Sequence, residues 1–409
     1  MTQQIEAYGK SIVNYAKSNY RKCFREPDGG LTYRFIVPGS CYTNSLWDWD
    51  CWLTNLALRK IVCHDDISEY EKGCVLNFLR FTDEIGRTPI YIMPHNTPSK
   101  VRPLTDEYNI HKPCLAQHAL FISEQNRDVE WLRDHFALIE RYLSWYETHA
   151  LHESGLYFWI NDSAIGVDND PCTFYRPAKS SASIYLNCLM YQELLATAKL
   201  ADLFGMPEKK AIYEEKAALL KDAIQEHCWD ERDGFFYSVD LNLLPINPSS
   251  GLHAGCPRHW NTLIQRIGVW SGFLAMWANI ATPEQADRMV KEHYRNEKTF
   301  HAPYGVRTLS KMEKMYAVIK SGNPSCWLGP IWGISNYMVF DGLQKYGYLY
   351  DAKELAEATI TLFGRDLETC GELHEYYHPE SGEPVNNPGF QNWNLLSLNM
   401  LEWLKELDE

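Results

Sequence analysis

The chain has 409 residues, of which 45% are hydrophobic and 13% aromatic, and its formal net charge is −14. The apolar content is enough for a large buried core, whereas the negative charge argues against nucleic-acid or anionic-membrane partners, which reward positive patches. No segment approaches the roughly 20 apolar residues of a transmembrane helix. The N-terminus lacks a basic region followed by an apolar one, so we expect a cytoplasmic protein.

The twelve cysteines are scattered and form no Cys-x-x-Cys pair. This spacing supports neither a zinc ribbon nor a redox pair. Several, such as Cys188, stand among apolar neighbours, where a reduced thiol behaves as a small hydrophobic side chain. We therefore expect free thiols in a reducing compartment, and we expect no cofactor and no metal.

The most unusual segment, residues 46–52, reads Leu-Trp-Asp-Trp-Asp-Cys-Trp. It places the flat faces of Trp47 and Trp49 beside the carboxylate of Asp50. A pyranose offers an apolar face of C–H groups to an aromatic ring and a rim of hydroxyls to hydrogen-bond acceptors. The segment therefore predicts a sugar-binding wall, although a tryptophan-rich helix start would use the same residues.

The next two candidates lie before residue 180. Gln117 carries an amide that both donates and accepts, which suits sugar hydroxyls. Asp168 lies in Gly-Val-Asp-Asn-Asp-Pro (166–171), inside an aromatic loop that spans 157–180. Poor solvation would raise the pKa of this carboxyl and keep it protonated as a general acid. A plain Asx turn is the competing interpretation of the same residues.

After this loop, the sequence predicts helices that follow one another in pairs. Apolar residues recur at helical spacing over 186–204 and 207–224, with a glycine and a proline between them. Further helices are predicted over 270–280, after a capping box at 282–285, and over 331–346, 352–362 and 393–407. Alternation typical of strands is confined to short pieces such as 157–160 and 235–237.

Long loops rich in aromatic residues separate these helices, and loops of such length are usually functional. They cover about 88–114, 157–180, 240–262, 297–330 and 371–392. No linker divides the chain. We therefore predict one all-α domain over residues 1–409, in which about a dozen helices form a closed ring of hairpins with the loops at one mouth.

Two of these long loops offer more site candidates. Tyr304 and Arg307 lie in the turn Pro-Tyr-Gly-Val-Arg. Trp327 and Trp332 flank a Gly-Pro turn and could wall a sugar site, although Trp332 could equally be a core residue at a helix start.

Loop 371–392 contains His374-Glu375-Tyr376-Tyr377-His378, which is formally the zinc-peptidase signature. That motif works only on a continuous helix, and Pro379 disfavours helical geometry at His378. We therefore interpret Glu375 as one carboxylate of a pair with Asp168, since glycoside hydrolysis needs two carboxyl groups flanking the scissile bond. A zinc peptidase remains a distant alternative.

In this order, the segments resemble the trehalase and α-glucosidase clan, and most closely the compact bacterial branch of glycoside hydrolase family 63, which hydrolyses mannosylglycerate or glucosylglycerate. The matching segments are 46–50, 112–117, 166–169, 303–307, 327–333, 375–383 and the last helix. The resemblance implies an (α/α)6 barrel and hydrolysis of an α-glycosidic bond with inversion. It places Asp168 at the position of the general acid and Glu375 at that of the base.

The resemblance also places Trp49, Asp50, Gln117 and Trp332 in the pocket of the non-reducing sugar. The full set of predicted substrate-binding residues is Trp47, Trp49, Asp50, Gln117, Tyr304, Arg307, Trp327, Trp332 and Tyr376. Leu328 stands where many relatives have an arginine. A carboxylate-bearing aglycone such as glycerate would therefore need another cation, such as Arg307 or Arg176.

The sequence thus predicts an inverting, exo-acting α-glycosidase for a small α-glucoside or α-mannoside, either a disaccharide or a glycosylglycerate. Two alternatives stay open. One is a sugar epimerase or isomerase on the same toroid that works through His374 and His378. The other is a non-catalytic sugar-binding protein.

Overall fold

The structure is a computed structural model that describes residues 2–97, 107–244, 249–251, 260–318 and 325–408. Parts of three predicted loops, 88–114, 240–262 and 297–330, lie outside the described residues, as does Cys256.

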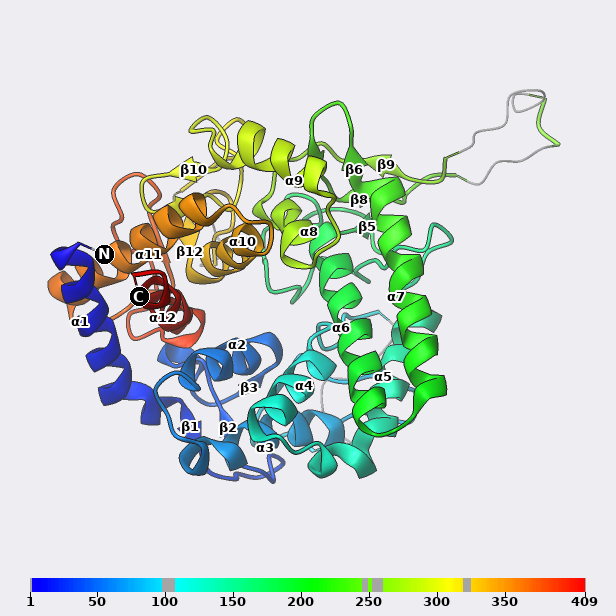
Figure 1. The fold of residues 1–409 in the computed structure, drawn as a ribbon. Helices are drawn as coiled ribbons and strands as arrows, with labels where there is room; N and C mark the ends of the chain where they lie inside the picture. The colour runs from blue at the N-terminus through cyan, green and yellow to red at the C-terminus, as the bar shows by residue number, and fades with distance from the viewer. Residues whose placement is uncertain (1, 98–106, 245–248, 252–259, 319–324, 409) are drawn as a thin grey trace.

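The helices form a closed ring of two layers (Figure 1). Alternate helices make the inner layer: α2 (Asp48–Leu58), α4 (Leu115–Asn126), α6 (Ile184–Leu203), α8 (Leu274–Trp277), α10 (Gly333–Lys345) and α12 (Ser397–Asp408). The outer layer consists of α1 (Gln3–Asn19), α3 (His64–Arg80), α5 (Phe136–His149), α7 (Pro207–Cys228), α9 (Pro283–Arg288) and α11 (Leu349–Cys370). This arrangement is an (α/α)6 barrel, so the predicted all-α toroid of helical pairs is confirmed.

Burial differs between the two layers. In α2 every residue except Leu56 is buried, because the outer layer covers one side and the centre of the ring the other. In α1 the buried residues are Ile5, Gly9, Ile12 and Ala16, which are spaced three or four apart on one face. One large apolar core runs around the ring, and it takes up a single face of the outer helix α1 but nearly the whole of the inner helix α2.

The structure corrects two local predictions. Segment 270–280 is a 3-10 helix, η4 (Trp270–Phe273), followed by the single turn of α8. Residues 157–160 form no strand, and Tyr157 makes only an isolated bridge with Leu151. The capping box at Thr282 is confirmed, because its hydroxyl accepts from Gln285 N and the Gln285 side chain accepts from Thr282 N.

Short antiparallel strands tie the loops together. Two pairs matter for the mouth of the ring: β3 (Leu46–Trp47) with β4 (Tyr91–Ile92), and β12 (Ile331–Trp332) with β13 (Tyr376–Tyr377). The remaining strands are β1 (Phe24–Arg25) with β2 (Phe35–Ile36), β5 (Ser181–Ala182) with β8 (Val239–Asp240) and β9 (Leu263–Ile264), β6 (Trp229–Asp230) with β7 (Phe235–Phe236), and β10 (His301–Ala302) with β11 (Gly305–Val306).

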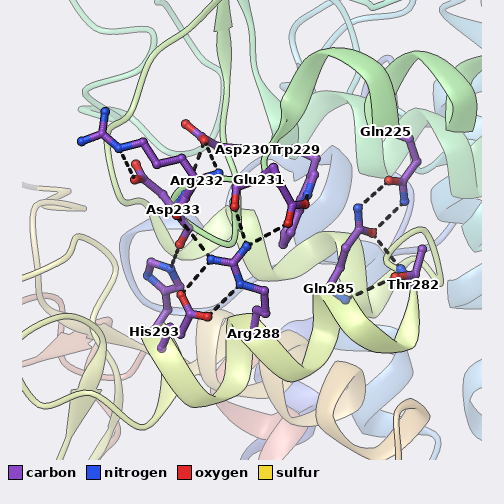
Figure 2. Close-up of polar contacts among 11 residues, drawn as sticks. Gln225, Trp229, Asp230, Glu231, Arg232, Asp233, Thr282, Gln285, Arg288 and His293 are labelled. Atoms are coloured by element: carbon purple, nitrogen blue, oxygen red, sulfur yellow. Dashed lines mark hydrogen bonds and ion pairs between the residues drawn. The ribbon is translucent and has the colours of Figure 1, made fainter.

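A polar network fastens the turn between β6 and β7 to α9 and to the following π-helix η5 (Met289–Tyr294) (Figure 2). Arg288 donates to the carboxylate of Glu292 at 2.8 and 3.1 Å and to the backbone carbonyl of Glu231 at 2.5 Å. His293 Nε2 lies 2.7 Å from the carbonyl oxygen of Asp233. We refer to this network, residues 229–233 with Arg288, Glu292 and His293, as the β6–α9 corner.

None of the helices in the described part of the chain is both long enough and apolar enough to cross a membrane.

Candidate active site

A pocket of about 120 Å³ opens at one end of the ring. Every residue that lines it either precedes an inner helix or stands in that helix's first turn. The inner helices alternate with outer ones, so they all run in the same direction and begin at the same end of the barrel. The lining residues are Tyr42, Trp47, Trp49, Asp50, Ile90, Lys112, Ala164, Gly166, Asp168, Ser325, Trp332, Glu375, Phe390 and Trp393.

The two carboxylates singled out from the sequence, Asp168 and Glu375, both line this pocket. They are joined there by Trp47, Trp49 and Asp50 from the beginning of α2, and by Trp332 from the beginning of α10. The structure therefore brings together side chains from four inner-helix loops.

The loop that carries Asp168 can reach the pocket because residue 166 is glycine. Gly166 has φ +89°, and a Cβ there would stand 2.8 Å from Trp49 and 2.6 Å from the Lys112 side chain. The turn interpretation holds for the next residues: Asn169 Oδ1 accepts from Trp327 N at 2.7 Å, and Asp170 accepts from the Thr173 hydroxyl at 3.2 Å. Asp168 itself is partly exposed and lines the pocket.

Glu375 is 3% exposed and is held by neutral donors. The Tyr42 hydroxyl donates to Oε1 at 3.2 Å, the Asn386 amide donates to Oε2 at 3.2 Å, and Asn387 donates to the same oxygen. Burial raises the pKa of Glu375 to about 7, and the charge of Asp168 acts in the same direction, while the three donors oppose the shift. Its place is fixed by the pairing of Tyr376 with Trp332 in the β12–β13 ladder.

Asp50 is the third carboxyl of the pocket. Its Oδ1 accepts from the amide of Asn392, whose own oxygen accepts from the Thr54 hydroxyl at 3.0 Å. Burial raises the pKa of Asp50 to about 7, against the positive charge of Lys112. Asp50 therefore lines the pocket with one neutral donor, Asn392, and its other lone pairs can accept hydrogen bonds from a bound molecule.

Lys112, the one cation among the described lining residues, forms an ion pair with Asp48. Lys112 Nζ lies 2.8 and 3.0 Å from the two carboxylate oxygens of Asp48, and its backbone N–H donates to the same carboxylate at 3.0 Å. Both side chains are buried. The Lys112 ammonium also lies 5.3 Å from the ring centroid of Trp49, and this cation–π contact helps to hold the ring in position.

The aromatic side of the pocket consists of stacked rings, of which one lines the pocket and two support it. Trp332 stacks on Trp327 with centroids 3.9 Å apart and an interplanar angle of 10°, and on Tyr376 at 4.9 Å. Trp332 lines the pocket, while Trp327 and Tyr376, both predicted to bind substrate, are buried and do not line it. Those two rings hold Trp332 in place.

Three more predicted substrate-binding residues do not line the pocket, because other parts of the chain use their polar groups. The Gln117 amide donates to the carbonyls of Pro113 and Leu189 at 2.6 and 3.1 Å. Arg307 is buried against the carbonyls of Glu297, Thr299 and His301 and pairs with Glu380 at 2.6 Å. The Tyr304 hydroxyl accepts from Arg365.

The zinc-peptidase interpretation of 374–378 is wrong, because the required helix is absent and strand β13 occupies Tyr376–Tyr377. His378 Nδ1 accepts from the N–H groups of Glu380 and Ser381 at 3.2 and 3.3 Å. His374 Nδ1 lies 2.9 Å from Asp366. Neither histidine lines the pocket.

The sequence analysis missed the residues that hold the carboxylates. Tyr42, Asn386, Asn387 and Asn392 carry no motif, and each meets its partner only through tertiary structure. Phe390 and Trp393 also line the pocket. Their position just before α12 was the one available signal, since α2, α4, α6 and α10 are preceded by pocket residues as well.

Comparison with known proteins agrees with this geometry. Residues 82–393 match the model of the "mannosylglycerate hydrolase MGH1-like glycoside hydrolase domain". A mannosylglycerate hydrolase of Rubrobacter radiotolerans is 24% identical over 203 residues, which cover 49% of this chain and 39% of that protein. A cytosolic neutral trehalase of Kluyveromyces lactis is 25% identical over 225 residues, 52% of this chain and 27% of that protein. The chain thus spans well under half of either relative.

Among solved structures, the GH63 mannosylglycerate hydrolase from Thermus thermophilus in complex with glucose superposes with a TM-score of 0.69 at 18% identity, covering 93% of this chain and 98% of that one. This likeness concerns the fold. Because the family model covers most of the chain, including Asp168 and Glu375, the protein belongs to the family of MGH1-like glycoside hydrolase domains.

Proposed function

We propose that the protein is an inverting, exo-acting α-glycosidase that hydrolyses a small α-glucoside or α-mannoside. The observation that carries this proposal is the meeting of Asp168 and Glu375 in one aromatic pocket, although 206 residues separate them in the chain. Membership of a glycoside hydrolase family supports it, as do relatives named for mannosylglycerate and trehalose hydrolysis.

In this proposal Asp168 donates a proton to the glycosidic oxygen as the bond from that oxygen to the anomeric carbon breaks. Glu375 takes a proton from a water molecule that attacks the anomeric carbon from the opposite face of the ring. Inversion needs room for that water, with the carboxyl groups roughly 6.5–9.5 Å apart. The assignment of Glu375 as base fits its partners, since Tyr42, Asn386 and Asn387 all donate to it and so favour the ionised carboxylate.

The remaining lining residues would bind the non-reducing sugar. Trp49 and Trp332 offer aromatic surface to the C–H groups of a pyranose, and Asp50 offers acceptor positions to its hydroxyls. Gln117, Tyr304 and Arg307 have no part in this proposal, and Trp327 and Tyr376 support it only through Trp332.

The charges of the pocket favour a neutral aglycone. Glycerate would need a cation in place of the arginine that Leu328 replaces. Arg307 is paired with Glu380, and Arg176 is paired with Asp240. Lys112 is the one cation among the described lining residues, and it is held by Asp48. We therefore expect α-linked disaccharides or neutral glycosides to be hydrolysed faster than glycosylglycerates.

We also infer that residues 1–409 act as one catalytic domain in the cytoplasm. The support is that a single ring uses both the first and the last helix. In addition, Cys51, Cys74, Cys114 and Cys188 are buried free thiols.

The test is a screen of α-linked disaccharides and glycosylglycerates, with NMR of the first-formed sugar. We expect release of a β-configured monosaccharide, and loss of turnover in Asp168→Asn with an unchanged circular dichroism spectrum. An α-configured first product would contradict inversion. Interconversion of free sugars without hydrolysis would identify an epimerase or isomerase, and saturable sugar binding without turnover would identify a binding protein.

A further inference from the structure

A second cluster of reactive side chains lies outside the pocket, at the C-terminal end of α11. Asp366 and Cys370 stand one helical turn apart on α11, and His374 follows the left-handed cap residue Gly371. One potential ligand atom from each residue lies within 4.8 Å of the other two. Within the described residues no other group of His, Cys, Asp and Glu comes together in this way.

The three groups match the preferences of one ion. A thiolate, an imidazole nitrogen and a carboxylate oxygen form a ligand set typical of Zn²⁺. The thiolate and the carboxylate together would balance the charge of a divalent cation. Three protein ligands leave a fourth tetrahedral position for water.

The geometry needs little adjustment. His374 Nδ1 lies 3.1 Å from Asp366 Oδ1, whereas nitrogen and oxygen ligands of tetrahedral zinc stand about 3.3 Å apart given bond lengths near 2.0–2.1 Å. Opening this pair by a few tenths of an ångström would admit the ion. Cys370 is exposed, and its sulfur lies 3.6 Å from the Thr369 hydroxyl, so its side chain would turn from that contact toward the other two ligands.

The carboxylate is already oriented by groups that would stay in place. Asp366 has a fully buried side chain, and its Oδ2 accepts from the Tyr377 hydroxyl at 2.8 Å and from His374 N at 3.1 Å. Such outer hydrogen bonds fix ligands in most metal sites and raise their affinity.

We propose that Asp366, Cys370 and His374 form a zinc-binding site that fastens the end of α11 to the loop carrying Glu375. The site is separate from the substrate pocket, and it departs from the absence of metals expected from the sequence. A bound ion would cross-link α11 to the residue preceding Glu375, and it would stabilise the fold in proportion to its occupancy.

The test uses full-length protein stripped of metal and titrated with Zn²⁺ in competition with a chromogenic chelator. A parallel titration with Cd²⁺ follows the ultraviolet thiolate-to-metal absorption. We compare wild type with Cys370→Ser and with Cys63→Ser. Cys63 is a matched control because it is also exposed and donates to a carboxylate, that of Asp66, at 3.2 Å, but forms no three-ligand group among the described residues.

We expect wild type and Cys63→Ser to bind one equivalent of Zn²⁺ with equal affinity, and Zn²⁺ to raise their melting temperature. Cys370→Ser should bind at least about tenfold more weakly and lose the Cd²⁺ absorption, and Tyr377→Phe should weaken binding about tenfold. Equal binding by wild type and Cys370→Ser would overturn the proposal. So would an equal loss in Cys63→Ser, since that result would indicate nonspecific binding by exposed thiols. Neither outcome bears on the glycosidase proposal.

Discussion

The pocket and the β6–α9 corner both gather several carboxylates, but they treat them in opposite ways. In the corner the partners are cations: Arg288 binds Glu231 (Figure 2) and Glu292. Next to the corner, Arg266 lies 2.5 Å from Asp230. The pKa of Glu292 is lowered, chiefly by its hydrogen bonds from Arg288.

In the pocket the side chains that donate hydrogen bonds to Asp50 and Glu375 are neutral. Asn392 donates to Asp50, and Tyr42 and two amides donate to Glu375. Burial without a paired cation raises the pKa of both carboxyls to about 7. A carboxylate paired with arginine has its charge and lone pairs occupied, whereas one held by amides keeps them available for substrate or water. The difference separates a structural network from a site that can do chemistry.

The largest expected effect concerns Glu375, the proposed base. Glu375→Gln should lower kcat by about 10²–10⁴-fold, because positioned proton transfer contributes that much to a reaction. The matched control is Glu292→Gln in the corner, which should leave kcat unchanged within experimental error. Steady-state kinetics on the best substrate measure both. Near-normal turnover in Glu375→Gln would remove this residue from the mechanism.

Next in size is the buried ion pair. Lys112→Met leaves the buried carboxylate of Asp48 without its partner and should reduce the free energy of unfolding by about 3–5 kcal/mol. The partly exposed pairs of Arg288 should matter far less, so Arg288→Gln should cost no more than about 1 kcal/mol. Urea denaturation compares the two. Equal losses would show that burial does not set the strength of these pairs.

The raised pKa of Asp50 predicts a pH-dependent difference in stability. A carboxyl whose pKa rises on folding, here to about 7, stabilises the fold fully below its unfolded value near 3.9 and loses that contribution as pH rises through about 7. The asparagine of Asp50→Asn does not titrate, so the variant does not lose this stability as pH rises. Its free energy of unfolding relative to wild type should therefore rise by about 3 kcal/mol between pH 5 and pH 8.

Glu292→Gln in the corner should change the free energy of unfolding with pH in the opposite direction. The pKa of Glu292 is lowered on folding, so wild type gains its contribution above the unfolded pKa and loses it as pH falls. Unfolding curves across the pH range test both variants. A flat difference for Asp50→Asn would show that this carboxyl is not shifted.

The smallest effect concerns the phenol that orients the base. Tyr42→Phe removes one donor to a charged group, which is worth about 1.5–3 kcal/mol, and should lower kcat roughly ten- to hundredfold. Because Tyr42 acts through Glu375, the loss should appear in kcat more than in KM. A change confined to KM would instead indicate direct contact with substrate.

Sequence patterns located the helices from residue 186 onward, whereas no individual helix was predicted before that residue, although α1 buries a single face. Pro207 and the Thr282 capping box mark true helix starts. The inner helix α2 is harder to predict, because it is buried on all sides and shows no polar face to set a period. The predicted helix 270–280 was too long, since Gly272 packs against Phe235 and Phe236 in a 3-10 turn.

Sequence patterns also identified only part of the candidate site. Asp168, Glu375 and the tryptophans around Asp50 could be found because their residue types are rare in that pattern before a helix. The sequence could not show that Gln117 and Arg307 lie outside this pocket, because their partners, the Leu189 carbonyl and Glu380, come from distant segments. Assigning a polar side chain to substrate requires knowing every competing acceptor, and only the folded chain supplies that.

The stacked indoles behind the pocket give the protein an optical signature. Trp327 and Trp332 lie 3.9 Å apart and nearly parallel, and Trp270 stacks at 6.1 Å from Trp327. Chromophores so close share their electronic excitation, so the near-ultraviolet circular dichroism of this protein should contain a coupled tryptophan band. That band reports the integrity of the sugar-facing wall in the absence of any substrate.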